Sequence, residues 1–537
     1  MKLVLYPLAI ISRLYRTVCK TSFRTDKPIT GDYYMSTISL SNSASSSSCA
    51  LSSTLREDLS KPSESKKPKK GQVRSIPGYR DFSLQEETLF TIWKKAVASS
   101  FESFGFVPME PRPVELVSNL LLKGGLDKEI YGMCRAEDGT PVKVGLPFDR
   151  TLPLALKVAQ SMDQMTFPYK RYDISYSFRG EKAMASAGRY RGFIQADVDI
   201  IDRNLAGSVT ADAACYATVY HTFKRLNFPK FTMHINHIKI ANAILKQLGF
   251  ENQDDRAKIL HLVDKLDKTP KEEVAKELLQ MFPRRKKAEM DRLLSQFSYV
   301  GDIDKAVFEE GLSAEAVAGV KELDNLFHRL EQLGVPRDSM IYNARMVRGL
   351  NYYTGTVVET LFDAPSNPEH QYLTKCGSIA SGGRYDKLVD TFVGRATEIE
   401  GVGISIGLTR VFDVLTSLGI ATPMRIGSAQ VLVGHRTEEE ENAATKAAGK
   451  IRELGIATDL YTARKKIKKQ FSYASKLGIP YCFMVMGSKS FVVKNLQTKE
   501  QQEYNTMDGA LAYIKKVVEQ HLEASIKIKE EGKEAVK

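Results

Sequence analysis

Two neighbouring segments alternate polar and apolar residues so strictly that they predict an antiparallel hairpin. They are KRYDISYSFR (170–179) and GRYRGFIQADVDII (188–201), joined by a glycine-flanked loop. Because successive side chains of a strand point to opposite faces, one face is apolar and the other is charged. The charged face holds Arg171, Asp173, Ser175, Ser177 and Arg179 on the first strand and Arg191, Gln195, Asp197 and Asp199 on the second. That face is either a solvated outer surface or a binding surface, and the adjacent loop rich in Arg and Gly favours binding.

A second cluster combines tyrosines with arginines and glycines. RGLNYYTGT (348–356) and SGGRYDKL (381–388) bring together Arg348, Tyr352, Tyr353, Arg384 and Tyr385. A tyrosine offers a flat ring and a hydroxyl, which suit a planar polar ligand.

A third cluster is GVGISIGLTRVF (401–412), where Gly401, Gly403, Ser405 and Gly407 share one strand face. With almost no side chains, that face is a floor on which a flat group can lie. Arg410 follows at the start of a predicted helix, where a phosphate would be stabilised. The glycine spacings match neither a P-loop nor a dinucleotide fingerprint.

Charge and the placement of histidines and cysteines indicate which ligands and partners the chain can have. The 537 residues carry 77 Lys and Arg against 64 Asp and Glu, and the net charge of +13 favours an anionic partner such as nucleic acid. Residues 1–70 contribute +7 of this charge, with twelve basic and five acidic residues, so the folded part is less basic than the whole.

His234 and His237, three residues apart in a predicted strand, point to opposite faces, and we predict no metal site. Six cysteines without CxxC spacing are typical of free thiols in a reducing compartment: Cys19, Cys49, Cys134, Cys215, Cys376 and Cys482.

The chain divides into four parts by composition. Residues 1–34 are rich in arginine and lack acids before Asp26, which predicts a mitochondrial presequence. A secretory signal is the rival, but free cysteines argue against it, and Met35 offers a second start for a cytosolic form. We therefore expect a cytoplasmic protein, a mitochondrial one, or both. Residues 35–70 are rich in Ser and Lys and predict a disordered linker.

Residues 71–425 read as strands and helices, interrupted by a helical insertion over 240–335. Residues 426–537 alternate strands with helices and end in a charged tail, which predicts a small α/β domain. No stretch approaches the roughly 18 apolar residues of a membrane span, so we expect no membrane association.

At this point the motifs resemble those of a known family. Phe178, Arg179, Gly180 and Glu181 resemble the second signature of class II aminoacyl-tRNA synthetases, and GVGISIGLTR resembles the third. RGLNYYTG and SGGRYD are similar to the two signatures peculiar to histidyl-tRNA synthetases. The resemblance implies an α+β fold, in which a class II antiparallel sheet core is flanked by helices, carries a helical insertion and precedes a C-terminal α/β anticodon-binding domain.

The resemblance also implies a two-step ligase. Histidine would attack the α-phosphate of ATP, with Mg²⁺ bridging the phosphate oxygens, and the histidyl group would then pass to the 3′ end of histidine tRNA. Arg179 and Arg348 match the family arginines at the α-phosphate, Arg410 matches the one at the γ-phosphate, and Glu181 matches the adenine position.

The same resemblance implies how histidine is held. Asp149 and Thr151, which we expect to share a strand face, match with Gln195 the positions that hold the ammonium group. Asp199 and Tyr353 match those that grip the imidazole, and Tyr385 closes the pocket. A site that hydrogen-bonds both ring nitrogens would reject side chains that lack them.

Four departures from the family pattern stand out. Arg112 occupies the position where the first signature usually has a proline. In this class that signature lies in the homodimer interface, and we still expect a homodimer. Asn351 replaces an aspartate and Gly192 an acidic residue. The loop 182–187 lacks the usual Arg-Pro start, so its contacts with the tRNA acceptor end are not carried over.

The main rival is a non-catalytic relative that acts as a histidine sensor or as the tRNA-binding module of a stress kinase. The sensor resembles the core alone, whereas this chain continues into a further domain. The kinase form would carry HRD and DFG signatures, which the sequence lacks.

Overall fold

The computed structural model describes residues 75–122, 129–203, 205, 208–267, 269–303, 313–347, 353–363, 373, 376–421 and 427–534. The predicted leader and linker lie outside these residues, as do Arg348, Asn351 and Tyr352. In the described part, no helix is both long enough and apolar enough to cross a membrane.

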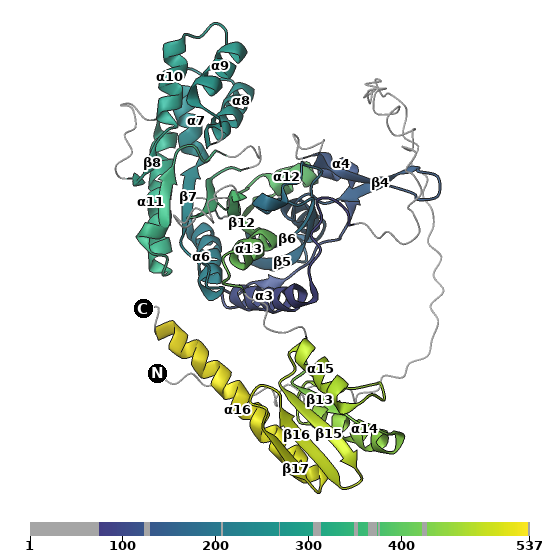
Figure 1. Cartoon of the computed structure of the whole chain (residues 1–537). Coiled ribbons are helices and arrows are strands. Elements are labelled where there is room, and N and C mark those ends of the chain that lie inside the picture. The colour runs from purple at the N-terminus through teal and green to yellow at the C-terminus, as the bar shows by residue number, and fades with distance from the viewer. Residues whose placement is uncertain are drawn as a thin grey trace, which may run out of the picture. The chain divides into compact units, whose positions relative to one another are not determined.

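A nine-stranded sheet organises the larger part of the chain (Figure 1). Its order is β1-β5-β6-β12-β11-β10-β7-β9-β8, and all pairs are antiparallel except β1 with β5 and β7 with β9. The strands are β1 (Val107–Pro108), β5 (Tyr169–Phe178), β6 (Gly192–Arg203), β7 (Phe231–His237), β8 (Val300–Gly301), β9 (Met340–Asn343), β10 (Thr356–Phe362), β11 (Ser378–Arg384) and β12 (Ile399–Ile406). The predicted mainly antiparallel core is confirmed, and β5 and β6 form the predicted hairpin.

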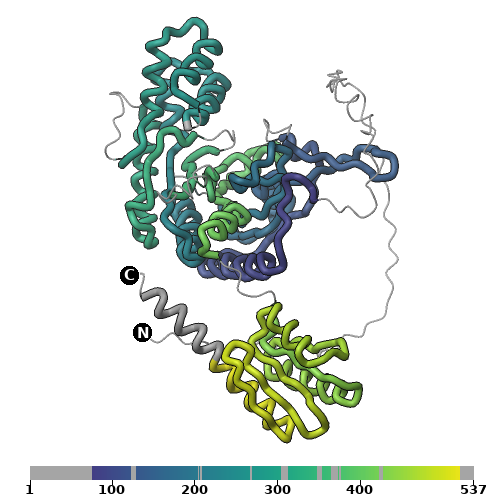
Figure 2. The backbone as a smooth tube through the Cα atoms, viewed as in Figure 1, coloured from purple at the N-terminus to yellow at the C-terminus, as the bar shows by residue number. Residues whose placement is uncertain are grey.

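The apolar face of that hairpin packs under three helices, α3 (Leu84–Glu102), α6 (Thr210–Arg225) and α13 (Leu408–Ser417). A capping box between Ser83 and Glu86 starts α3 and satisfies backbone donors at its first turn. The ring of Phe412 on α13 meets those of Phe90 and Trp93 on α3, each at 5.1 Å. Figure 2 shows the purple α3 beside the green α13, although about 300 residues separate them in the sequence. The charged face of the hairpin is therefore left on the other side of the sheet.

Smaller elements close the edges of the sheet. Helices α5 (Thr151–Ser161) and α12 (Leu388–Val393) share a separate apolar cluster with Ile201 and Ile399. A three-stranded sheet of order β2-β4-β3 is formed by β2 (Glu115–Leu116), β3 (Tyr131–Cys134) and β4 (Pro141–Leu146), with helix α4 (Val117–Leu121) packed on it.

The expected helices between β7 and β9 are present. They are α7 (Ile238–Gln247), α8 (Gln253–Val263), α9 (Lys271–Met281), α10 (Lys287–Gln296) and α11 (Ala314–Gln332). Their buried leucines and isoleucines belong to the same core cluster as the main sheet. One short strand inside this segment, β8, returns to pair with β9, which helical periodicity could not have indicated.

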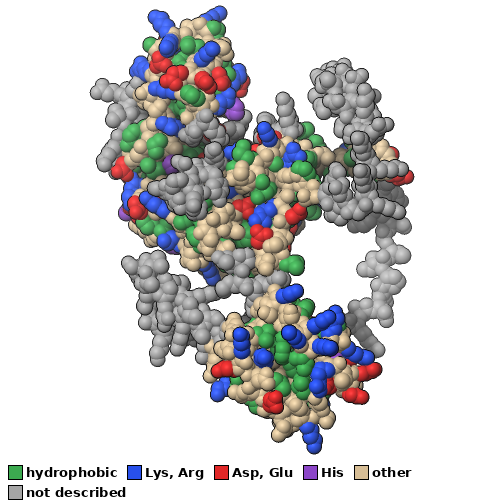
Figure 3. Space-filling view, viewed as in Figure 1, with side chains coloured by type: hydrophobic (Ala, Val, Ile, Leu, Met, Phe, Trp, Pro, Cys, Tyr) green, Lys and Arg blue, Asp and Glu red, His purple; other side chains and the backbone are tan. Residues whose placement is uncertain are grey.

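The C-terminal part has its own five-stranded sheet, of order β14-β13-β15-β16-β17. Its strands are β13 (Val431–Gly434), β14 (Thr458–Leu460), β15 (Tyr481–Gly487), β16 (Ser490–Asn495) and β17 (Gln501–Tyr504), and its helices are α14 (Glu438–Glu453), α15 (Ile467–Leu477) and α16 (Met507–Glu534). Two apolar clusters lie within it, and the predicted α/β architecture is confirmed. The segment before α15 and the first turn of α15 expose a run of cations: Arg464, Lys465, Lys466, Lys468 and Lys469. Figure 3 shows Lys and Arg side chains gathered on the C-terminal part.

Candidate active site

Two adjoining pockets lie on the charged face of the main sheet, over β6, β11 and β12. The arginine pocket is lined by Arg179, Glu181, Gly188, Arg189, Tyr190, Phe193, Gln195, Ser378, Ile379, Ala380, Ser381, Ser405, Gly407 and Arg410. The acidic pocket is lined by Asp149, Thr151, Arg179, Gln195, Asp197, Asp199, Tyr353, Ser381, Gly382, Tyr385, Gly403, Ile404 and Ser405. Four residues line both: Arg179, Gln195, Ser381 and Ser405. Thus two ligands bound side by side would meet at these four residues.

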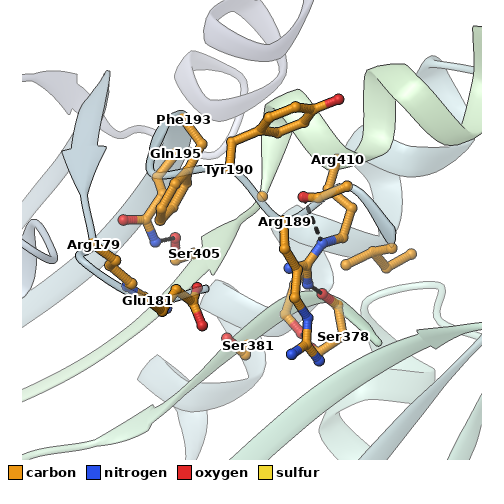
Figure 4. A pocket seen from close by; sticks show the side chains of 14 residues that line it. Arg179, Glu181, Arg189, Tyr190, Phe193, Gln195, Ser378, Ser381, Ser405 and Arg410 are labelled. Carbon is orange, nitrogen blue, oxygen red and sulfur yellow. Dashed lines mark hydrogen bonds between the residues drawn. The ribbon is translucent and has the colours of Figure 1, made fainter. Parts of the chain in front are cut away.

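Three guanidinium groups give the arginine pocket its character. Arg179 and Glu181 lie on one side of it, and Arg189 and Arg410 on the other (Figure 4). Arg179 leaves the end of β5, its Nε donates to the carbonyl of Phe148 at 3.0 Å, and its guanidinium lies 5.3 Å from the ring centre of Phe193.

Arg410 occupies the first turn of α13 and is anchored by backbone carbonyls. It donates through Nη1 to the carbonyl of Ser378 and through Nε to that of Gly188 at 3.4 Å. Burial lowers the pKa of the Arg410 guanidinium, and the nearby cations of Arg189 and Arg179 lower it further. Cations crowded together at a helix N-terminus suit a polyanionic ligand such as a triphosphate.

Asp199 is the most firmly held carboxylate of the acidic pocket. Its Oδ2 lies 2.7 Å from Arg171 Nη2, and its Oδ1 accepts a hydrogen bond of 2.5 Å from the Tyr385 hydroxyl. Burial raises the pKa of the Asp199 carboxyl, whereas the Arg171 cation acts in the opposite direction. A carboxylate has about four lone-pair positions, so Asp199 can still accept from a ligand.

Strand β12 carries Gly401, Gly403 and Ser405 of the predicted glycine floor, whereas Gly407 follows the strand and precedes α13. The protein's own side chains already lie on part of this floor. A Cβ at Gly401 would clash with the ring of Tyr385, and a Cβ at Gly403 would clash with Asp199 Oδ1. These glycines therefore admit the Tyr385 and Asp199 side chains that form one wall of the acidic pocket.

The prediction that Asp149 and Thr151 share a strand face is wrong, although both line the acidic pocket. Strand β4 ends at Leu146, and Thr151 is the first residue of α5. Asp149 Oδ1 accepts from the backbone N–H of Leu152 at 3.1 Å, which satisfies a donor of the first helical turn. A short aspartate that binds the backbone favours a helix start over a continued strand.

The charged hairpin face is buried beneath the pockets, so the solvated alternative is excluded. Arg171 is fully buried, and its Nη1 lies 3.6 Å from Asp173 Oδ2. Arg150 donates to the same Asp173 oxygen at 2.7 Å. Sequence reasoning placed Arg171 and Asp173 on this face but missed this ionic layer and the contribution of Arg150, because the partner comes from a different segment.

Three other residues singled out from the sequence contact other parts of the protein. Arg384 lines neither pocket: its Nη2 pairs with Asp212 Oδ2 at 2.8 Å, and it also donates to two backbone carbonyls. Gly192 leaves room for Tyr79, because a Cβ there would lie 2.7 Å from the Tyr79 ring. Arg112 is largely exposed and pairs with Glu115 Oε2 at 3.0 Å.

His234 and His237, the two histidines considered as a metal pair, each contact another side chain. His237 is buried, and its Nε2 shares a hydrogen bond of 2.8 Å with Glu322 Oε2. His234 Nδ1 lies 3.1 Å from the side-chain amide of Asn343. Within the described ranges, no group of three or more His, Cys, Asp or Glu residues is suited to a metal ion.

Residues 78–411 match the family model for histidyl-tRNA synthetases, and residues 429–517 match that for an anticodon-binding domain. The histidine-tRNA ligase of Clostridium tetani is 33% identical over 482 residues, covering 86% of this chain and 100% of that protein. The histidine-tRNA ligase of Wolinella succinogenes is 35% identical over 448 residues, covering 81% and 97%.

Solved structures are similar as well. The histidyl-tRNA synthetase of Nostoc sp. PCC 7120 superposes with a TM-score of 0.69 at 29% identity, covering 84% of this chain and 99% of that one. A Bacillus halodurans protein, described as an ATP phosphoribosyltransferase regulatory subunit/histidyl-tRNA synthetase, has a TM-score of 0.59 at 19% identity and covers 75% and 97%. At that identity the second likeness shows the fold alone.

Proposed function

The chain belongs to the histidyl-tRNA synthetase family, and from that membership we propose that its two pockets join histidine to ATP. The carboxylate of histidine attacks the α-phosphorus of ATP, pyrophosphate leaves, and histidyl-adenylate remains. A terminal ribose hydroxyl of histidine tRNA then attacks the carbonyl carbon, which forms the ester and releases AMP. The observation that carries this proposal is the contact between the pockets: Arg179 and Gln195 line both, so two ligands would meet beside a fixed cation.

The arginine pocket would bind ATP. Arg179, together with Arg348, would hold the α-phosphate, Arg410 the γ-phosphate, and Glu181 the adenine. Preorganised cations around a reacting phosphate stabilise charge that shifts in the transition state, and they need no proton transfer. Glu181 is the single carboxylate among the described lining residues of this pocket. Mg²⁺ would therefore be held mainly by the phosphates of ATP, whose charge it would neutralise, as that ion commonly is.

The acidic pocket would bind histidine. Asp149, Thr151 and Gln195 would receive the ammonium, and Asp199 and Tyr353 the two ring nitrogens, with Tyr385 closing the pocket through its bond to Asp199. Buried polar groups left without partners are costly, so an amino acid that lacks both nitrogens would bind poorly. Exchange of pyrophosphate into ATP, measured with each amino acid in turn, tests both pockets together.

The rival function, a histidine sensor without catalysis, would need the acidic pocket alone. Arg189 and Arg410 line the arginine pocket but not the acidic pocket. They would have no role in holding a free amino acid and therefore favour an enzyme. The match of residues 429–517 to an anticodon-binding domain also supports a tRNA partner.

We further propose a homodimer. Apolar side chains are exposed on the small three-stranded sheet and on α4, close to Arg112: Leu116, Leu121, Leu122 and Met133. An exposed apolar cluster rimmed by polar residues is typical of an interface. Sedimentation at micromolar concentration should give about twice the 60.0 kDa chain mass. A species of single-chain mass alone would contradict this.

For residues 1–34 we propose mitochondrial targeting, with a cytosolic form started at Met35. A fusion of residues 1–34 to a fluorescent reporter should enter mitochondria, because the segment is rich in arginine and poor in acids. A reporter that stays wholly cytosolic would refute it. The family matches at 78–411 and 429–517 support the proposed boundaries of the core (71–425) and the C-terminal domain (426–537).

A further inference from the structure

A chain of three polar side chains links β6 to β12 where the two pockets meet. The hydroxyl of Ser405 donates to Asp197 Oδ1 at 2.5 Å. Its oxygen accepts from Gln195 Nε2 at 2.7 Å, the hydrogen bond drawn in Figure 4. Ser405 and Asp197 are directly opposite in the strand pair, and Gln195 lies two residues along on the same face. The strand register therefore fixes all three side chains together.

The order of donors in this chain sets the orientation of the Gln195 amide. An ionised Asp197 can only accept, so it takes the single hydroxyl proton of Ser405. The Ser405 oxygen must then accept, which turns the amide nitrogen of Gln195 toward it. The amide oxygen is left pointing away, and among the described residues Gln195 Oε1 has no hydrogen-bond partner although the side chain is 92% buried (8% exposed). A buried acceptor of this kind is costly unless a ligand supplies a donor.

We infer that Asp197 and Ser405 are positioning residues, which hold the Gln195 amide with its oxygen toward the α-ammonium of the amino acid. The inference rests on the proposed function for the identity of that amino acid. An ammonium group has three donors and no acceptor, so it binds the oxygen of the amide and is repelled by its NH₂. Asp197 and Ser405 thus act through Gln195 and need not touch the substrate.

Protonation of Asp197 should reverse the orientation of the Gln195 amide. Burial raises the pKa of this carboxyl to about 7, with Asp199 and Asp173 raising it and Arg171 and the Ser405 hydroxyl lowering it. Below that pH a protonated Asp197 can donate to Ser405, which frees the Ser405 proton for Gln195 Oε1. Both hydrogen bonds then reverse, and the amide NH₂ faces the ammonium. Histidine should therefore bind more weakly as the pH falls through about 7, and bound ammonium should in turn favour the ionised carboxylate.

The test compares histidine affinity, measured by calorimetry, with the kinetics of pyrophosphate exchange in the full-length protein. Ser405→Ala should weaken histidine binding and raise KM for histidine about tenfold, with kcat changed less than about threefold. Ser177→Ala is the matched control, because it removes another buried serine hydroxyl of the same sheet that lines neither pocket. Ser177→Ala should leave the histidine affinity and KM for histidine unchanged. The two variants should have the same melting temperature as the wild-type protein.

A double-mutant cycle separates positioning from direct contact. In the Gln195→Ala background, Ser405→Ala should have little further effect, because Ser405 acts only through that amide. A full effect of Ser405→Ala in that background, or none in the wild-type protein, would overturn the inference. Failure of the wild-type protein to bind histidine would overturn the inference as well. Histidine binding without exchange would instead refute the proposed function and leave the cycle decisive.

The pH arm uses Asp197→Asn, which cannot ionise but whose oxygen can still accept from Ser405. Free histidine titrates in the same range, near pH 6.5, but it contributes equally in both proteins. Between pH 8 and 6 the histidine dissociation constant should rise more steeply for the wild-type protein than for Asp197→Asn. If the dissociation constants of the two proteins change in parallel with pH, Asp197 does not control the orientation of the Gln195 amide.

Discussion

Replacing Arg179 by alanine should slow pyrophosphate exchange by roughly a hundredfold or more, the largest loss expected from any described residue. Its guanidinium lines both pockets and is held by the Phe148 carbonyl and the Phe193 ring. In the proposed reaction it would therefore lie where the carboxylate of one ligand approaches the phosphorus of the other. Lysine should restore only part of the rate, since it keeps the charge but lacks the planar fork that binds two oxygens.

A matched control is Arg203→Ala. Arg203 also lies over a phenylalanine ring, 5.4 Å from the centre of Phe167, but it lines neither of the two pockets. Its removal should leave exchange unchanged, which would exclude a general effect of losing a stacked arginine. Near-normal exchange by Arg179→Ala would contradict the proposed role, as would a lowered melting temperature that accounts for the loss.

Replacing Arg348 by alanine should also reduce turnover by roughly a hundredfold or more, with the affinities for histidine and ATP changed little. Arg348 lies outside the described residues, and its proposed role as a cation at the α-phosphate follows from the RGLNYYTG motif. That motif leads to Tyr353, which lines the acidic pocket. Lysine should again restore only part of the activity.

The alternative for Arg348 is a structural pair with Asp386 or another acid. Asp386 already accepts from the Thr354 hydroxyl at 2.5 Å, and its other oxygen lies 3.9 Å from Arg384 Nη1. If Arg348 were structural, Asp386→Asn would reproduce its loss, and both changes would lower the melting temperature and raise KM for histidine. Normal turnover by Arg348→Ala would remove this arginine from the mechanism.

Local patterns predicted the parts of the fold in which side-chain direction follows from chain position. The alternation in 170–179 and 188–201 placed Gln195 and Asp199 on one face, and both line the acidic pocket. The glycines before Arg410 indicated a strand leading into a helix, which is observed. Period-two and period-3.6 patterns depend only on neighbours in the sequence, so one chain suffices to read them.

Features that depend on distant partners could not be predicted in this way. On the buried polar face of the hairpin, Arg150, 21 residues before Arg171, supplies a second cation to Asp173. The bond from Tyr385 to Asp199 joins residues 186 apart. Strand β17 has no clear sequence signal, because its residues are polar and mostly exposed and it pairs only with the edge of β16.

Exchange of labelled pyrophosphate into ATP shows whether this protein activates histidine. The full-length protein is offered each of the twenty amino acids in turn, with ATP and Mg²⁺. Histidine alone should support rapid exchange, because the contacts proposed for Asp199 and Tyr353, which both line the acidic pocket, would need a side chain with two polar nitrogens. If exchange is absent with histidine, or equally fast with another amino acid, this protein is not a histidine-specific activating enzyme.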